Sequence, residues 1–253
     1  MLIVVSPAKK LDFATPAPTK NFSQLTEIEK SKVLIKELRK CDASKISSLM
    51  KLSESLTDLN IQRYKDFKTP FSLKNAKQAM FAFKGDTYVG LDPETMKESD
   101  INYAQKHLRI LSGLYGLVSP LDLIQPYRLE MGTKFACQGS KNLYEFWQES
   151  ITAQLNKALK KENTLINLAS KEYFSAVNTN NLEAEVITPI FKEKKGDEFK
   201  IVSFFAKKAR GMMSRYIVDK RIEDPKELLK FDIDGYQFNK KLSQDLEPVF
   251  TRG

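Results

Sequence analysis

Short apolar runs, set among long stretches of helical periodicity, constrain the fold of this chain most. Residues 2–5 (LIVV), 108–112 (LRILS) and 164–168 (TLINL) have the length and the apolar content of buried strands. The helical stretches between them do not follow a strict strand–helix–strand order. This mixture predicts an α+β fold, in which a single compact domain over residues 1–253 has a mixed β-sheet flanked by helices.

Helical periodicity dominates residues 24–67, where Asp42 or Ser44 is placed to cap a second helix. The segment 46–67 has the length and shape of a helix-hairpin-helix, with its turn expected at residues 56–60 (LTDLN). That turn lacks the glycine with which such motifs approach a DNA phosphate. An ordinary helical hairpin packed on the core is therefore an equally good interpretation of the segment.

The sequence of the rest of the chain predicts further helices and strands. The expected helices are residues 99–107, an amphipathic helix at 142–161 and a basic helix at 205–221. The expected strands are residues 79–85 and a β-hairpin made of 184–191 and 199–204 around the polar turn 194–197.

The composition of the chain favours an anionic partner. The formal net charge is +9 over 253 residues, which suits nucleic acid or another polyanion. Cys41, Cys137 and His107 have no metal-ligand spacing, so we expect reduced thiols, no metal site and no cofactor. No apolar run approaches the roughly 20 residues that span a bilayer, and no signal peptide is present. We therefore expect a soluble cytoplasmic protein without a membrane partner; no sequence feature predicts its oligomeric state.

The basic helix concentrates the positive charge. Residues 200–221 hold seven lysines and arginines, opposed within that segment by Asp219 alone. Helical spacing places one set on a shared face: Lys207, Lys208, Arg210, Gly211, Ser214 and Arg215. The opposite, packing face then holds Phe205, Ala209, Met212, Met213 and Tyr216.

Gly211 lies within the expected cationic face, although glycine costs about 1 kcal/mol relative to alanine inside a helix. One explanation is the close approach of a phosphate backbone to the helix surface at this position. The alternative is an ordinary solvated charged face, with Gly211 packed under another element of the protein.

Polar side chains also interrupt apolar sequence outside this helix. Lys84 and Asp86 flank Gly85 at an expected strand end, which fits a catalytic or phosphate-binding loop and equally a surface turn. Arg109 lies inside an apolar strand, where an arginine must be paired or must line a cleft. The same two interpretations apply to the polar residues that follow it in sequence: Ser112, Tyr115, Arg128 and Glu130.

Several blocks of sequence, taken in this order, resemble a known family: residues 6–12 (SPAKKLD), 82–91 (AFKGDTYVGL), 107–132 (HLRILSGLYGLVSPLDLIQPYRLEMG), 165–173 (LINLASKEY), 202–216 (VSFFAKKARGMMSRY) and 235–238 (GYQF). They resemble the YaaA peroxide-stress family over nearly the whole chain. The resemblance implies the YaaA-type (cantaloupe) fold, with a positively charged cleft and a helix-hairpin-helix element that maps to residues 46–67. It also implies binding of double-stranded DNA without strong sequence preference, and protection from peroxide damage linked to DNA repair and to the limitation of reactive iron. The family has no firmly assigned catalytic activity.

The leading hypothesis is a DNA-binding protein of the peroxide stress response. Its expected contacts to DNA come from the basic helix and the cleft: Lys207, Lys208, Arg210, Gly211, Arg215, Lys9, Lys84, Arg109 and Arg128. The rival hypothesis is an enzyme that acts on a nucleotide-like small molecule or a damaged base. Its pocket would be built from Lys9, Lys84, Asp86, Ser112, Tyr115, Arg128 and Glu130.

Overall fold

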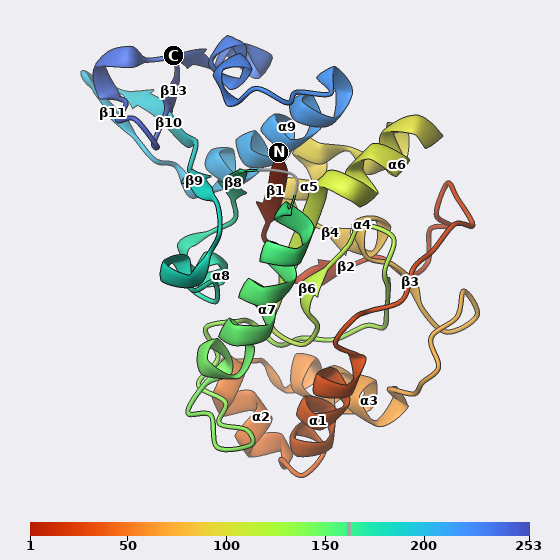
Figure 1. The fold of residues 1–253 in the computed structure, drawn as a ribbon. Coiled ribbons are helices and arrows are strands. Elements are labelled where there is room, and N and C mark those ends of the chain that lie inside the picture. The colour runs from red at the N-terminus through yellow and green to blue at the C-terminus, as the bar shows by residue number, and fades with distance from the viewer. Residues whose placement is uncertain (161–162) are drawn as a thin grey trace.

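The computed structural model describes residues 1–160 and 163–253, and its centre is a five-stranded mixed sheet (Figure 1). The strand order is β6-β5-β1-β8-β9, in which β5, β1, β8 and β9 are parallel and β6 is antiparallel to β5. The bounds are β1 (Leu2–Val5), β5 (Leu108–Ser112), β6 (Gly116–Val118), β8 (Thr164–Leu168) and β9 (Glu185–Ile187). The three strands predicted at 2–5, 108–112 and 164–168 are therefore confirmed.

A second sheet, of four strands, lies at the C-terminal end of the molecule in Figure 1. It consists of β11 (Glu198–Lys200), β10 (Ile190–Lys195), β13 (Val249–Arg252) and β12 (Gln237–Phe238), in that order. The predicted hairpin is confirmed around its turn, since β10 and β11 pair antiparallel. Its outer parts are different: residues 185–187 join the central sheet as β9, and the second hairpin strand ends at Lys200 rather than at residue 204.

Two short ladders complete the strands. β2 (Lys10–Leu11) pairs with β4 (Phe83–Lys84), and β3 (Lys77–Gln78) pairs with β7 (Leu123–Ile124). The prediction of one strand over residues 79–85 is wrong, because Ala79–Ala82 forms a helical turn, α4, and only two residues of the segment are extended. All four residues of α4 are buried on every side, so no alternation of burial distinguishes a strand from a helix there.

Three N-terminal helices lie at the end of the molecule opposite the second sheet, at the bottom of Figure 1. They are α1 (Ile28–Leu38), α2 (Ala43–Met50) and α3 (Glu54–Asp66), and Asp42 caps α2 by accepting from the Lys45 N–H at 2.7 Å. The helical hairpin exists, but its predicted turn is misplaced: residues 56–60 lie inside α3. The chain reverses at Lys51, which is in the left-handed region with φ 52°, and Ser53 caps α3.

The remaining helices cover the central sheet and its edges (Figure 1). Their bounds are α5 (Asp86–Leu91), α6 (Glu98–His107), α7 (Leu143–Leu159), α8 (Lys171–Phe174) and α9 (Ser203–Lys220). The helix predicted at 142–161 is confirmed as α7, and residue 161 lies outside the described residues. Short 3-10 turns follow at η1 (Pro93–Thr95), η2 (Thr179–Asn181), η3 (Pro225–Lys230), η4 (Ile233–Gly235) and η5 (Lys240–Leu242).

The core contains all of β1 and the inner face of α7. Every residue of β1 is buried, and Trp147 of α7 is fully buried, with its indole N–H donating to the Gly113 carbonyl at 2.9 Å. Within residues 1–160 and 163–253, no helix is both long and apolar enough to cross a bilayer.

Candidate functional site

A cavity of about 340 Å³ lies at the carboxyl edge of the central sheet. The loop after β1 and the residues after β8 form its floor, because both parallel strands end at the same edge. The turn from β4 into α5 forms one wall, and α9 supplies another. The polar residues that line it are Ser6, Lys9, Lys10, Lys84, Asp86, Thr87, Ser170, Glu172, Lys207 and Arg210.

Close packing between α5 and α9 places α9 beside this cavity. A Cβ added at Gly211 would overlap the Thr87 carbonyl oxygen and would lie 2.7 Å from the Leu91 nitrogen. A Cβ at Gly90 would likewise overlap the Lys208 carbonyl oxygen. The expected contact of Gly211 with a phosphate backbone is therefore wrong, since the α5 backbone occupies that surface. Gly211 and Ser214 are buried, so the face predicted to be cationic is partly a packing face.

Arg210 and Lys207 project from α9 into the cavity from successive turns. Arg210 is half-buried, and loss of water around its guanidinium lowers the pKa of that group. Its guanidinium has no hydrogen bond and no ion pair with any described residue. Each of the other arginines donates to an oxygen: Arg39, Arg63, Arg109, Arg128, Arg215, Arg221 and Arg252. The cavity thus holds a desolvated cation with which no carboxylate of the described residues pairs.

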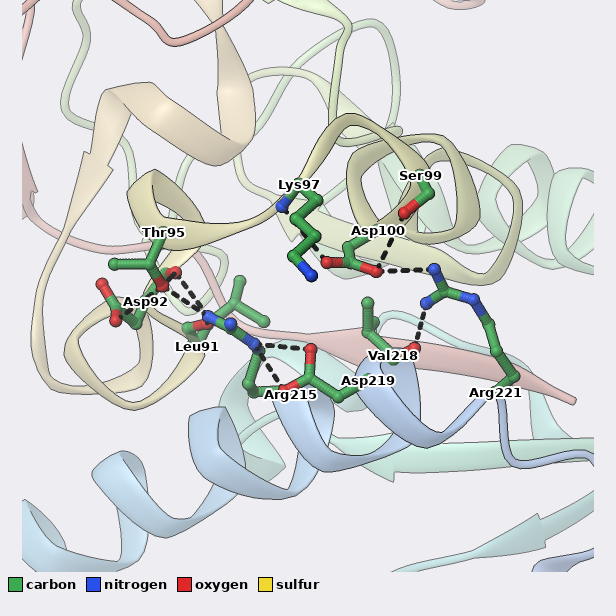
Figure 2. Close-up of polar contacts among 10 residues, drawn as sticks. All are labelled: Leu91, Asp92, Thr95, Lys97, Ser99, Asp100, Arg215, Val218, Asp219 and Arg221. Atoms are coloured by element: carbon green, nitrogen blue, oxygen red, sulfur yellow. Dashed lines mark hydrogen bonds and ion pairs between the residues drawn. The ribbon is translucent and has the colours of Figure 1, made fainter.

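Arg215, in contrast, is engaged within the protein (Figure 2). Its Nε donates to Asp219 at 2.8 Å, and its Nη1 donates to the Asp92 carbonyl and the Thr95 hydroxyl, each at 2.8 Å. This side chain ties α9 to the end of α5, so the expectation that it contacts DNA is corrected to a structural role. Lys208 pairs with Asp234 at 3.3 Å, and both side chains keep about a third of their surface exposed.

Lys9, Arg128 and Glu130 meet in a small depression next to the cavity. Glu130 Oε1 lies 3.2 Å from Lys9 Nζ and 2.9 Å from the Arg128 guanidinium. The internal Arg–Glu pair weighed from the sequence is therefore present. Lys9 also lines the main cavity, and its side chain is 66% exposed, which leaves its ammonium accessible to solvent.

Lys84 lines both the main cavity and a larger cavity of about 770 Å³. Its ammonium pairs with Glu94 and lies 3.8 Å from Asp12. Asp86 lines both cavities, is half-buried, and forms no hydrogen bond or ion pair with any described residue. Among the described residues, one carboxylate (Asp86) and three cations (Lys10, Lys207 and Arg210) without side-chain partners therefore share the main cavity.

Three of the predicted site residues lie elsewhere. Ser112 and Tyr115 are fully buried beneath the site: the Ser112 hydroxyl bonds to the Tyr127 hydroxyl at 2.7 Å, and the Tyr115 hydroxyl bonds to the Gln125 backbone. Arg109 donates to the carbonyls of Gln105 and Leu108 at the end of α6 and lines a separate cavity. These corrections have one cause. A polar side chain in apolar sequence can form its hydrogen bonds with backbone groups or with another side chain, and no sequence pattern shows those partners.

Sequence reasoning missed Ser6, Ser170 and Glu172. Ser6 Oγ accepts from the Ser170 N–H at 2.8 Å, which joins the ends of β1 and β8 at the cavity floor. Ser6 directly follows one predicted strand and Ser170 comes two residues after another, so the rule that ligands bind at carboxyl strand ends was the available signal. To bring the two serines together in one site, that rule also requires knowing that β1 and β8 are neighbours in the sheet.

No group of three or more potential metal ligands occurs within residues 1–160 and 163–253.

Comparison with known proteins gives the family. Residues 1–242 match the family described as "Peroxide stress protein YaaA". Over 254 residues the chain is 53% identical to a UPF0246 protein of Alteromonas mediterranea, covering 100% of this chain and 98% of that protein. It is 52% identical to a UPF0246 protein of Shewanella loihica and 51% identical to one of Colwellia psychrerythraea, with 98% and 99% of those proteins covered. With the family matched along nearly all of its length and half of its residues shared with full-length relatives, the chain belongs to the YaaA family of peroxide stress proteins.

Proposed function

We propose that this protein binds double-stranded DNA, largely without sequence preference, as part of the peroxide stress response to which its family belongs. The phosphate backbone lies across the mouth of the main cavity. Lys207 and Arg210 contact the phosphates, and Lys9 contributes because its side chain is 66% exposed beside Glu130. Gly211 and Arg109 are left out because they contact backbone groups of the protein. The side chains that pair with carboxylates are left out as well: Lys84, Arg128, Lys208 and Arg215.

Arg210 carries the proposal. A half-buried guanidinium without an anion is unfavourable in the free protein, and a phosphate removes that penalty by supplying charge-assisted hydrogen bonds. Lys207 on the preceding turn is exposed and has no acidic partner among the described residues. The two cations therefore offer neighbouring phosphates a preformed contact.

The test is a salt titration of binding to two duplexes of unrelated sequence. Each neutralised phosphate contributes about −0.9 to the slope of log K against log salt. Replacing both Lys207 and Arg210 by alanine removes two such contacts, so the slope becomes shallower by about 1.8 and both duplexes lose affinity alike.

A matched control removes the same charge elsewhere. Lys240 and Lys241 are exposed on η5, and replacing both by alanine changes the net charge equally. This control should keep a slope close to that of the unmodified protein. Equal slopes for the two double variants, or binding that does not change with salt, would sink the proposal.

A second candidate function, an enzyme acting on a nucleotide or damaged base, rests on Asp86. It is an ionisable group without a partner in a cavity with unpaired cations, which is a common setting for acid–base chemistry. Against this candidate, Lys84, Arg128 and Glu130 are committed to ion pairs within the protein. Three of the residues predicted for the pocket of this enzyme line the main cavity: Lys9, Lys84 and Asp86.

A further inference from the structure

The interior of the main cavity is the wrong size for a duplex. Its volume is about 340 Å³, close to the lower limit of about 300 Å³ for pockets that enclose small molecules. The major groove of B-DNA is by itself about 12 Å wide, so a duplex can only lie across the opening. Asp86 and the Ser6 and Ser170 hydroxyls line the cavity but take no part in the proposed DNA contacts, so they need a separate explanation.

We propose that the cavity binds a small phosphate monoester, with its phosphate on Arg210 and Lys207 and a hydroxyl or amino group of the same molecule on Asp86. This inference deepens the second candidate function by naming the class of ligand. It does not depend on DNA binding, so either can fail alone.

The charges select a phosphate over a carboxylate. Arg210 and Lys207 are both unopposed, and a phosphate monoester carries about −1.5 to −2 at pH 7, which neutralises both cations. A carboxylate would neutralise one. The planar guanidinium also fits two phosphate oxygens at once, a geometry that an ammonium does not provide.

Asp86 specifies the rest of the ligand. Its carboxylate lines the same cavity, but it is not within the 4.0 Å ion-pair distance of Arg210 or Lys207. Asp86 therefore pairs with neither cation and is available to a second group of the ligand. A carboxylate without partners is an acceptor only, so the ligand must bring a donor to it.

The cavity floor is polar as well. The Ser6 and Ser170 hydroxyls lie 3.3 Å apart, and both line the cavity. Lys9 reaches the cavity from the loop after β1 while it pairs with Glu130. Hydroxyls at the floor with a guanidinium on α9 suit a polar, phosphorylated molecule of sugar phosphate or nucleotide size.

Isothermal titration calorimetry of the full chain at low salt tests the site with three probes: ribose 5-phosphate, 2′-deoxyadenosine 5′-monophosphate and ribose. We expect the two phosphate monoesters to bind and ribose to give no binding heat. Tighter binding of the nucleotide would show that the site also recognises a base. Equal binding of the two monoesters would show that a sugar phosphate is sufficient.

Two variants connect binding to the named residues. Arg210→Ala should weaken ribose 5-phosphate binding at least about tenfold, the loss expected for charged hydrogen bonds, and Arg210→Lys should restore part of it. Asp86→Asn should lower the affinity for ribose 5-phosphate relative to inorganic phosphate about fivefold, because inorganic phosphate does not need the acid. Thermal unfolding of each variant shows that it is folded.

The inference would be overturned if neither monoester bound at a concentration about 100 times a typical metabolite Kd of about 0.1 mM. It would also be overturned if Arg210→Ala bound ribose 5-phosphate with unchanged affinity. The outcome is separable from that for DNA. Asp86→Asn removes a negative charge, so it should leave duplex binding unchanged or slightly stronger. Duplex binding without monoester binding therefore removes this inference alone, and the reverse result removes the DNA proposal alone.

Discussion

Many cations in this protein stabilise its own backbone. Lys77 donates to the Asp12 and Thr15 carbonyls at 2.9 and 2.7 Å, and Lys30 donates to the Phe146 carbonyl at 2.7 Å. Arg39 donates to three carbonyls around the end of α3. The formal charge of +9 is therefore a poor guide to the charge available for a ligand. What distinguishes Arg210 among the arginines is that its guanidinium donates to no oxygen of the described residues.

Asp12 provides a prediction at the same scale. Its Oδ1 accepts the N–H groups of Thr15 and Ala14, each at 2.9 Å, and these bonds lower the pKa of the carboxyl from 3.8 to about 2. Because the pKa is lower in the folded state, the stabilisation is fully present above pH 3.8 and is lost as the pH falls through about 2. Carboxyl NMR should give a midpoint near 2.

The control for that titration is Asp12→Asn, which keeps an acceptor but cannot ionise. The difference in unfolding free energy between the natural protein and this variant should shrink between pH 4 and pH 2. A carboxyl midpoint at or above 3.8 would contradict the prediction.

At the scale of elements, α9 shows what periodicity can assign. The helix and the buried Ala209, Met212 and Met213 follow the predicted pattern. Phe205, however, is 38% exposed and stacks under Arg252, and Gly211 is buried. The difference arises because α9 contacts the sheet on one side and α5 on another. A helix covered on two sides does not have the single apolar stripe that a hydrophobic pattern predicts.

Gly211→Ala should be strongly destabilising. The added methyl group would overlap the α5 backbone, which cannot move like a flexible side chain, so we expect a loss of about 3 kcal/mol or more in unfolding free energy. Urea denaturation measures it. Lys207→Ala, an exposed position on the same helix, controls for helix propensity and should change stability by less than about 0.5 kcal/mol. If the two variants were equally stable, the close α5–α9 contact would be wrong.

At the scale of the whole molecule, two candidate DNA-binding elements lie at opposite ends. The α2–α3 hairpin is at the bottom of Figure 1, and α9 lies near the top, beside the second sheet. A single duplex that touched both would have to run along the body of the protein. The proposed contacts at Lys207 and Arg210 need only the cavity end.

This separation gives a prediction about the hairpin. Lys45 on α2 and Lys65 on α3 are both exposed. If the cavity end supplies the phosphate contacts, replacing both by alanine should leave the salt slope of duplex binding unchanged, since no phosphate contact is lost. A slope shallower by about 1.8 would place the hairpin on the DNA and would require a longer binding site.

The sequence by itself determined much of the local structure of this protein, but not the helical turn α4 or the position of the turn between α2 and α3. The β-branched run at 2–5, the Asp42 cap and the apolar face of α7 each depend on neighbours within a few residues, and all were predicted correctly. Only the tertiary structure decided the site. The adjacency of β1 and β8 brings Ser6 to Ser170, and the α5–α9 contact buries Gly211 while Arg210 faces the cavity. The physical reason is that the free energy of a charge depends on which oxygens surround it in space, and those oxygens come from segments far apart in the chain.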